Sequence, residues 1–273
     1  MTTWSAAGTI TFTEDTLVRS TGSRKVRCAT SGRACSNVGV TENAASSKPV
    51  QNVPSGGGTA HGYLAVPPAG RGPGVVVIQE WWGLTTHIKD VTDRLATEGF
   101  VALAPDLFGG ATTHDSDEAG KLMSELPVEQ AARDLAGAVD FLLGHEAVTS
   151  STVGAVGFCM GGGFVLVLAA QQGDRIGAAV PFYGVLKADY PSFETLTAPL
   201  MGHLGEQDDF TTPDAVRELV ARIEKESTVT PQFFFYPAGH AFFNDENLLG
   251  TYDPEQAALA WERTVAFLHE HLG

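Results

Sequence analysis

The sequence is organised around residues 153–163, which read Val-Gly-Ala-Val-Gly-Phe-Cys-Met-Gly-Gly-Gly. Residues 153–158 are apolar and include β-branched side chains, a pattern that is typical of a buried strand. Residues 164–170 continue as an apolar run without a turn residue, which favours a buried helix, although Val165 and Val167 also permit a strand. The stretch therefore predicts a strand and a helix joined by a tight turn that contains one cysteine.

The turn itself, Gly157-Phe158-Cys159-Met160-Gly161, matches the G-x-S-x-G nucleophile elbow with sulfur in place of oxygen. A nucleophile in such a turn adopts a strained backbone, so the residues two positions to either side must be small. The N-terminus of the following helix favours a thiolate, and the N–H of Met160 would form half of an oxyanion hole. The alternative is a buried structural cysteine beside glycines, because free cysteines are often buried.

The composition narrows the class of protein. The 273 residues are enough for one large α/β domain with a tail, with 43% hydrophobic and 18% charged residues. A net charge of −15 argues against nucleic acid or an anionic membrane as a partner. Three cysteines without a disulfide framework fit a reducing cytoplasm. We expect neither a signal peptide nor a membrane span.

Residues 1–55 differ from the rest of the chain. They are rich in Ser, Thr and Gly, and they hold six basic residues against three acidic ones. Cys28 and Cys35 have no companion pair of Cys or His, so a metal site there is not expected. We predict that residues 1–55 form a poorly structured extension, with a loose hairpin over residues 8–19 as the alternative, and that residues 56–273 form the folded domain.

Apolar strands alternate with amphipathic helices from residue 59 onwards, and the first of them reads as an edge strand. The predicted strands cover residues 60–66, 74–79, 100–104, 153–158, 177–183, 198–204 and 232–236, and the predicted helices cover residues 85–98, 128–143, 213–225 and 254–272. This alternation predicts an α/β protein with a mostly parallel central sheet flanked by helices on both faces.

Titratable residues follow the ends of several predicted strands, where catalytic groups of such sheets lie. Glu80 follows the strand over residues 74–79, and Cys159 follows the strand over residues 153–158. Asp208 and Asp209 follow the strand over residues 198–204, and His240 follows the last strand. The order nucleophile, acid, base along the chain is that of α/β-hydrolases, so we predict that fold.

Each of these residues has a chemical role in the predicted site. Cys159 attacks an acyl carbon, His240 carries the proton, and Asp208 orients the imidazole, with Asp209 as the alternative acid. The second donor of the oxyanion hole is expected from the loop after residues 74–79, most simply the N–H of Trp81.

Five motifs resemble the dienelactone hydrolase family, the carboxymethylenebutenolidases, and the resemblance covers about residues 58–273. They are Gln79-Glu80-Trp81-Trp82-Gly83, Ala104-Pro105-Asp106-Leu107-Phe108, Gly157-Phe158-Cys159-Met160-Gly161-Gly162, Gly205-Glu206-Gln207-Asp208 and Gly239-His240-Ala241-Phe242. This is a branch of the α/β-hydrolases with a cysteine nucleophile. The resemblance implies that Glu80 lies beside the thiol and helps to activate Cys159 when an anionic substrate arrives.

The sequence departs from that family where the substrate carboxylate is held. Lactone-hydrolysing members use arginines, yet this chain has Asn244 a few residues after the histidine. Residues 109–126 contain Lys121 but no Arg. Asparagine cannot supply the charge of a bidentate arginine. We therefore expect the chemistry of the family to carry over, and its dienelactone specificity not to.

Aromatic and acidic side chains near these motifs have two interpretations each. Trp81-Trp82 and Phe242-Phe243 either line an acyl pocket or belong to the core, and Asn244 is a third candidate for substrate contact. Residues 114–118, His-Asp-Ser-Asp-Glu, either bind a metal or cap a helix, and we favour the cap.

The sequence thus predicts a hydrolase that cleaves a carboxylic ester or lactone through a Cys-His-Asp triad and an acyl-enzyme. The alternatives are a thioesterase or general carboxylesterase with the same triad, or a catalytically silent binding protein on this fold. We expect a cytoplasmic monomer or weak homodimer that needs no cofactor and acts on a small molecule.

Overall fold

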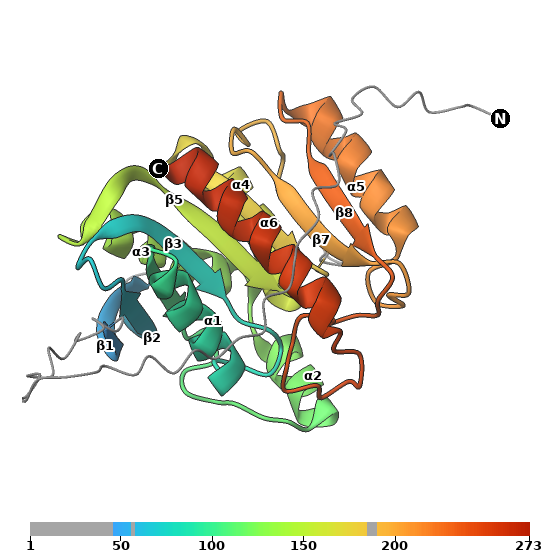
Figure 1. Cartoon of the computed structure of the whole chain (residues 1–273), viewed down its shortest axis with the longest axis horizontal. Helices are drawn as coiled ribbons and strands as arrows, with labels where there is room; N and C mark the ends of the chain where they lie inside the picture. The colour runs from blue at the N-terminus through green and yellow to red at the C-terminus, as the bar shows by residue number, and fades with distance from the viewer. Residues whose placement is uncertain (1–45, 56–57, 185–189) are drawn as a thin grey trace, which may run out of the picture. The chain divides into compact units, whose positions relative to one another are not determined.

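An eight-stranded sheet forms the centre of the molecule, and helices cover both of its faces (Figure 1). The computed structural model describes residues 46–55, 58–184 and 190–273. The hairpin considered for residues 8–19 and the cysteines at positions 28 and 35 lie outside these ranges. In the described residues, no helix has the length and apolarity needed to cross a membrane.

The strands are joined in the order β1-β2-β4-β3-β5-β6-β7-β8. Their bounds are β1 (Ser46–Ser55), β2 (Gly58–Val66), β3 (Gly72–Ile78), β4 (Val101–Pro105), β5 (Val148–Phe158), β6 (Ile176–Phe182), β7 (Met201–Gly205) and β8 (Gln232–Tyr236). The pairs β1–β2 and β2–β4 are antiparallel, whereas all the pairs from β4 to β8 are parallel. The predicted mostly parallel sheet is confirmed.

The first strand corrects two predictions. Residues 46–55 were expected to be poorly structured, but they form β1 and pair with β2 from Ser46–Val66 to Ser55–Gly58. That expectation is wrong for these residues. A strand can form by backbone pairing with a neighbour even where its own sequence shows no apolar alternation, so the sequence pattern did not reveal β1. The pairing also makes β2 an internal strand, so the edge position predicted for residues 60–66 is wrong. Residues 1–45 lie outside the described part of the chain.

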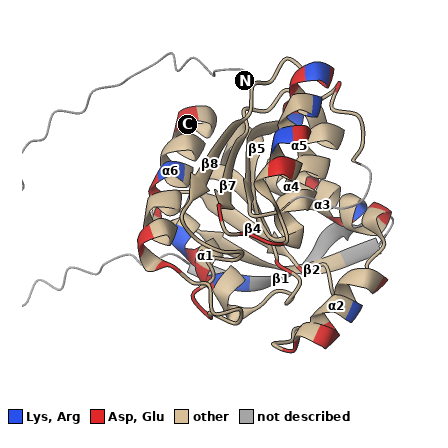
Figure 2. Ribbon diagram, turned by 90° about the vertical axis from the view of Figure 1, so that its right-hand side faces the viewer, with Lys and Arg blue, Asp and Glu red and all other residues tan. Residues whose placement is uncertain are grey.

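Six α-helices accompany the sheet in the described chain. They are α1 (Thr86–Thr97), α2 (Ser116–Glu125), α3 (Val128–Leu143), α4 (Met160–Gln172), α5 (Pro213–Glu226) and α6 (Pro254–Leu272). Helices α1 and α6 pack on one face of the sheet, and α3 and α4 pack on the other. Charged residues are spread over the outer helices, as Figure 2 shows for α5 and α6.

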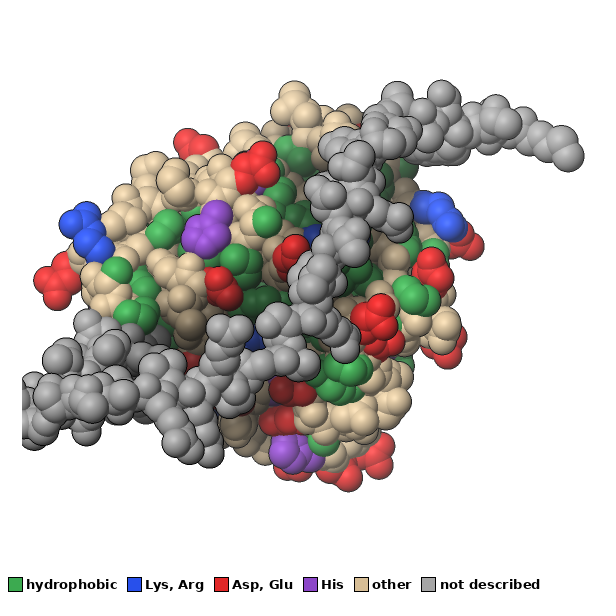
Figure 3. Space-filling model, viewed as in Figure 1, with side chains coloured by type: hydrophobic (Ala, Val, Ile, Leu, Met, Phe, Trp, Pro, Cys, Tyr) green, Lys and Arg blue, Asp and Glu red, His purple; other side chains and the backbone are tan. Residues whose placement is uncertain are grey.

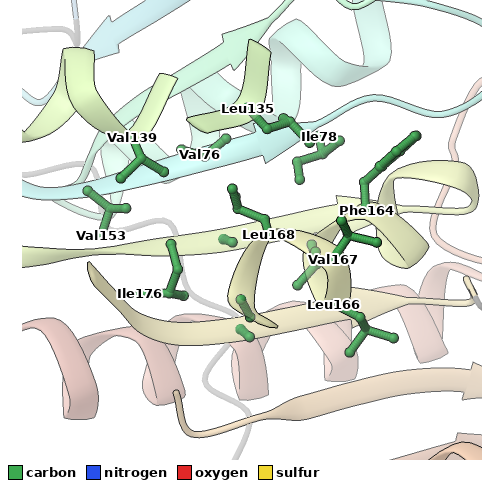
Figure 4. Packing of buried hydrophobic residues seen from close by; sticks show 14 of the residues in the cluster. Val76, Ile78, Leu135, Val139, Val153, Phe164, Leu166, Val167, Leu168 and Ile176 are labelled. Atoms are coloured by element: carbon green, nitrogen blue, oxygen red, sulfur yellow. The ribbon is translucent and has the colours of Figure 1, made fainter. Parts of the chain in front are cut away.

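The apolar run over residues 164–170, for which the sequence favoured a helix but also permitted a strand, is part of helix α4. Its residues from Met160 to Ala170 are all buried, so the helix is apolar on every side rather than amphipathic. Helix α3, in contrast, presents one apolar stripe. Figure 4 shows its Leu135 and Val139 lying over Val76 and Ile78 of β3. This packing anchors β3 and β5, and therefore the loops that follow their carboxyl ends.

The acidic opening of α2 is a cap, as favoured above. The Asp115 carboxylate accepts hydrogen bonds from the backbone N–H groups of Asp117 and Glu118, at 3.0 and 2.9 Å. These bonds satisfy two of the N–H groups that a helix leaves free at its first turn. His114 lies 3.5 Å from a carboxylate oxygen of Glu246, on a different segment.

Candidate active site

Cys159 occupies a strained turn between β5 and α4. Its backbone has φ 52° and ψ −117°. A positive φ is strained for a residue other than glycine. A Cβ atom on Gly157 would lie 2.3 Å from the carbonyl oxygen of Gly161. A Cβ atom on Gly161 would lie 2.4 Å from the carbonyl oxygen of Ile78 in β3. The predicted need for small residues on both sides of the cysteine is therefore confirmed by the packing.

Three segments bring the predicted cysteine, histidine and aspartate into one chain of contacts. His240, in the loop after β8, has Nε2 3.2 Å from Cys159 Sγ. Its Nδ1–H donates to Asp208 Oδ2 at 2.8 Å. Both His240 and Asp208 are buried, whereas Asp209 is exposed. Of the two candidate acids, Asp208 is the one in contact with the imidazole.

The loop between β7 and α5 fixes the Asp208 carboxylate. Its second oxygen, Oδ1, accepts hydrogen bonds from the backbone N–H groups of Phe210 and Thr211, both at 2.8 Å. Burial by itself lowers the pKa of His240, but the hydrogen bonds and charges of Asp208 and Cys159 raise it to about 10. The imidazole is therefore a strong proton acceptor, and it lies within contact distance of the Cys159 sulfur.

A pocket of about 360 Å³ opens beside the cysteine and the histidine. This volume falls within the size range of small-molecule sites. Its walls come from α2, α3, α4 and the loops at the carboxyl ends of the strands. The lining residues are Trp81, Met123, Leu126, Val128, Cys159, Met160, Phe164, Tyr183, Gly184, Phe210, Thr211, His240 and Leu249.

Glu80 lies buried behind this pocket. Its carboxylate accepts hydrogen bonds from the Tyr183 hydroxyl at 3.1 Å and from Asn244 Nδ2 at 2.5 Å. Burial raises the pKa of Glu80, while the neighbouring His87 and these two donors counteract the rise. The expectation drawn from the family, that Glu80 lies beside the thiol, stays a prediction beside these contacts. Tyr183, which lines the pocket, connects Glu80 to it through the hydrogen bond of its hydroxyl.

Tyr183 is a site residue that the sequence analysis missed. It is fully buried, has φ 33°, and packs its ring against His240 with 5.2 Å between ring centroids. Its carbonyl oxygen accepts a hydrogen bond from the Thr211 hydroxyl at 3.2 Å. Burial raises the pKa of the Tyr183 hydroxyl well above its usual value, and the nearby charges of Glu80 and Cys159 add to the rise. Its position directly after β6 is the signal that would have found it.

The remaining predicted residues divide between pocket and core. Trp81 and Met160 line the pocket. Met160 is the first residue of α4, so its N–H has no acceptor inside the helix. Trp82, Phe242 and Asn244 are buried and lie outside the lining, so the predicted substrate contact of these three side chains is not supported by their positions.

The hydrogen bonds of Asn244 explain where its side chain is instead. Its Nδ2 donates to Glu80, and its Oδ1 accepts from the N–H of Glu246 at 2.9 Å.

Within residues 46–55, 58–184 and 190–273, no group of three or more His, Cys, Asp or Glu side chains is arranged to hold a metal ion.

Comparison with known proteins agrees with this arrangement of motifs. The model of the dienelactone hydrolase family matches residues 60–272. Protein usf of Aquifex pyrophilus is 37% identical over 217 residues, covering 77% of this chain and 93% of the relative. A carboxymethylenebutenolidase of a Pseudomonas species is 28% identical over 223 residues, covering 78% of this chain and 91% of the relative.

A solved structure gives the same result for the fold. The crystal structure of a dienelactone hydrolase-like promiscuous phosphotriesterase from metagenomic libraries superposes with a TM-score of 0.75 at 26% identity, covering 84% of this chain and 100% of that chain. The predicted α/β-hydrolase fold is thereby confirmed. This chain belongs to the dienelactone hydrolase family of carboxylic ester hydrolases.

Proposed function

We propose that this protein hydrolyses a carboxylic ester or lactone through a triad of Cys159, His240 and Asp208. The observation that carries the proposal is the continuous chain of contacts from Sγ to Nε2 and from Nδ1 to Oδ2, at 3.2 and 2.8 Å, beside the pocket. Nucleophile, base and orienting acid in this sequence of contacts are the requirements of acyl transfer.

Acylation begins when the Cys159 thiol passes its proton to His240 Nε2. The thiolate then attacks the acyl carbon, and the carbonyl oxygen becomes an oxyanion. The N–H groups of Met160 and Trp81 are the proposed donors that stabilise it. When the carbon–oxygen bond breaks, the leaving alkoxide takes the proton from Nε2, and the acyl group remains on sulfur as a thioester.

Deacylation repeats these steps with water. A water molecule gives a proton to His240 Nε2 as its oxygen attacks the thioester carbon, and the carboxylic acid and free thiol are released. Asp208 keeps the Nδ1–H facing away from the reacting atoms and stabilises the imidazolium. Glu80 is a positioning residue in this scheme, because its hydrogen bond holds the Tyr183 ring that packs against His240.

Two alternatives to this function use the same site. The first is a thioesterase or a general carboxylesterase, which is favoured by the apolar pocket and by the hydrogen bond that holds Asn244 to Glu80 outside the pocket lining. The second is a binding protein without turnover. The cytoplasmic location and the monomeric or weakly dimeric state stay predictions.

Turnover of three substrates tests the proposal. A dienelactone, a p-nitrophenyl ester and an acyl thioester are offered to the wild type and to Cys159→Ala, with thermal melting as the control for folding. We expect Cys159-dependent turnover of at least one substrate and a transient mass increase on Cys159 equal to the acyl group. Turnover that survives in a folded Cys159→Ala protein would contradict the proposed nucleophile, and tight binding without turnover would favour the binding protein.

A further inference from the structure

The pocket beside Cys159 has apolar walls that the hydrolysis reaction by itself does not require. We propose that the site selects uncharged esters with an extended apolar acyl chain, and that it discriminates against substrates carrying a carboxylate on that chain. This inference rests on the proposed hydrolase function and names its class of substrate.

The rim of the pocket is the first observation. Met123 on α2, Val128 at the start of α3 and Phe210 in the β7–α5 loop are 41%, 38% and 59% exposed, and all three line the pocket. Large apolar side chains left in water around a cavity mark a surface that binds an apolar ligand. Met123 and Val128 lie close together in the sequence, but Phe210 comes from a distant loop, so the exposed apolar rim is built by two separate regions of the chain.

The apolar surface continues from the rim to the reacting atoms. The Phe210 ring lies 4.9 Å from the His240 ring, centroid to centroid, and Phe164 and Met160 of α4 form the wall on the side of Cys159. A chain bound against these residues reaches the thiol without leaving apolar contact. Each methylene buried along this path is worth about 0.8 kcal/mol of transfer free energy in general.

Charge in and around the pocket supplies the second observation. Among the described residues that line the pocket there is no Lys or Arg. The buried carboxylates nearest to it are Asp208, which is bound to His240, and Glu80, which is bound to Tyr183. The whole chain carries −15, and acidic side chains are spread over the face seen in Figure 3. Among the described lining residues, a substrate carboxylate would thus lose its water without gaining a Lys or Arg counterion.

The position of Asn244 completes the argument. This is the residue at which the sequence lacks an expected arginine, and it is turned towards Glu80 rather than into the pocket. The pair is buried, so a polar substrate group cannot reach it without disrupting two hydrogen bonds. Neither a cation nor a free amide is offered to an anionic substrate from this side.

Two substrates of equal shape test the discrimination. The p-nitrophenyl monoester of adipic acid carries a terminal carboxylate, and p-nitrophenyl 6-methylheptanoate carries two methyl groups in place of the two carboxylate oxygens. We expect kcat/KM to be at least about a hundredfold higher for the neutral ester, since burying an unpaired carboxylate costs several kcal/mol. Along the series acetate, butyrate and hexanoate, kcat/KM should rise about fourfold for each methylene.

A matched pair of variants links the effect to the rim. Met123→Lys places a cation at the rim on an exposed helical position, and Leu259→Lys places the same charge on α6, away from the pocket. We expect Met123→Lys to raise kcat/KM for the adipate monoester by about threefold or more and to lower it for the neutral ester. Leu259→Lys should leave both values close to those of the wild type.

The outcomes separate this inference from the function beneath it. If the wild type hydrolyses both esters in a Cys159-dependent way but favours the adipate monoester or treats both alike, the apolar selectivity is refuted and the hydrolase function stands. If a folded wild-type protein turns over neither ester faster than Cys159→Ala does but hydrolyses the dienelactone or the thioester, the inference is refuted and the hydrolase function stands. If it hydrolyses none of these substrates in a Cys159-dependent way, the proposed function fails and the inference fails with it.

Discussion

Replacing Asp208 with asparagine should abolish activity while keeping the fold, and the reason is the direction of its hydrogen bonds. Oδ1 accepts from two backbone N–H groups, and Oδ2 accepts from His240. Asparagine has one oxygen for these two positions. If its amide group faced the backbone, both N–H donors would be left unpaired, and the buried donor of Thr211 alone would cost about 1–3 kcal/mol.

In the variant Asp208→Asn, the oxygen of the new side chain therefore faces the backbone, and its amide group faces His240 Nδ1. An amide donor there requires Nδ1 to accept, which places the ring hydrogen on Nε2, opposite Cys159. The imidazole can then no longer take the thiol proton. The corresponding exchange in a serine-hydrolase triad lowers kcat about ten-thousand-fold, equivalent to about 5 kcal/mol, and we expect a similar loss here.

The assay compares Asp208→Asn with Asp209→Asn, which removes the same charge from the adjacent, exposed residue. We measure kcat with a p-nitrophenyl ester, the rate of alkylation of Cys159 by iodoacetamide, and the melting temperature. Asp209→Asn should remain within about twofold of the wild type, because a surface charge has a small effect. Retention of more than about a tenth of the activity by Asp208→Asn, or a large loss in Asp209→Asn, would refute the reasoning.

Two further predictions concern stability. Gly161→Ala should lower the free energy of unfolding by about 1–3 kcal/mol, because the new methyl group meets the Ile78 carbonyl; Gly120→Ala, which meets nothing within 4 Å, is the control in thermal melts. Burial raises the pKa of Glu80 above 4.5, so its contribution to stability is present below pH 4.5 and is lost as the pH rises through the raised value. Melts of wild type and Glu80→Gln from about pH 4 to about pH 8 should show the variant gaining relative stability as the pH rises, while Glu262→Gln, at an exposed position, should show no such trend.

Most elements of the fold were predictable because their signals are local. The predicted strand over residues 232–236 and helix over residues 254–272 coincide with β8 and α6. The strand β1 was not predictable in this way, since its residues carry no apolar alternation and it is defined by pairing with β2. Which strand pairs with the ten residues of β1 is decided only when the chain folds, and the sequence of those residues does not indicate it.

The site was predictable to a similar extent. The contacts among Cys159, Asp208 and His240 were predictable from their places after strands, because parallel strands bring their carboxyl ends to one edge of the sheet. Spacing did not distinguish Asp208 from Asp209; the burial of one and the exposure of the other do. Burial also removes Trp82 and Phe242 from the pocket, although both are adjacent in sequence to motif residues.

The sequence by itself determined which chemistry to propose, because a strained turn with glycines on both sides of a cysteine, followed by an acid and a histidine at later strand ends, can be read from residue types and order. The tertiary structure alone decided the surroundings of that chemistry. It turned Asn244 towards Glu80, placed Tyr183 between Glu80 and His240, and brought Phe210 of the β7–α5 loop beside the apolar side chains of α2 and α3. These features depend on which side chains meet after folding, and contacts between distant segments leave no periodicity in the sequence.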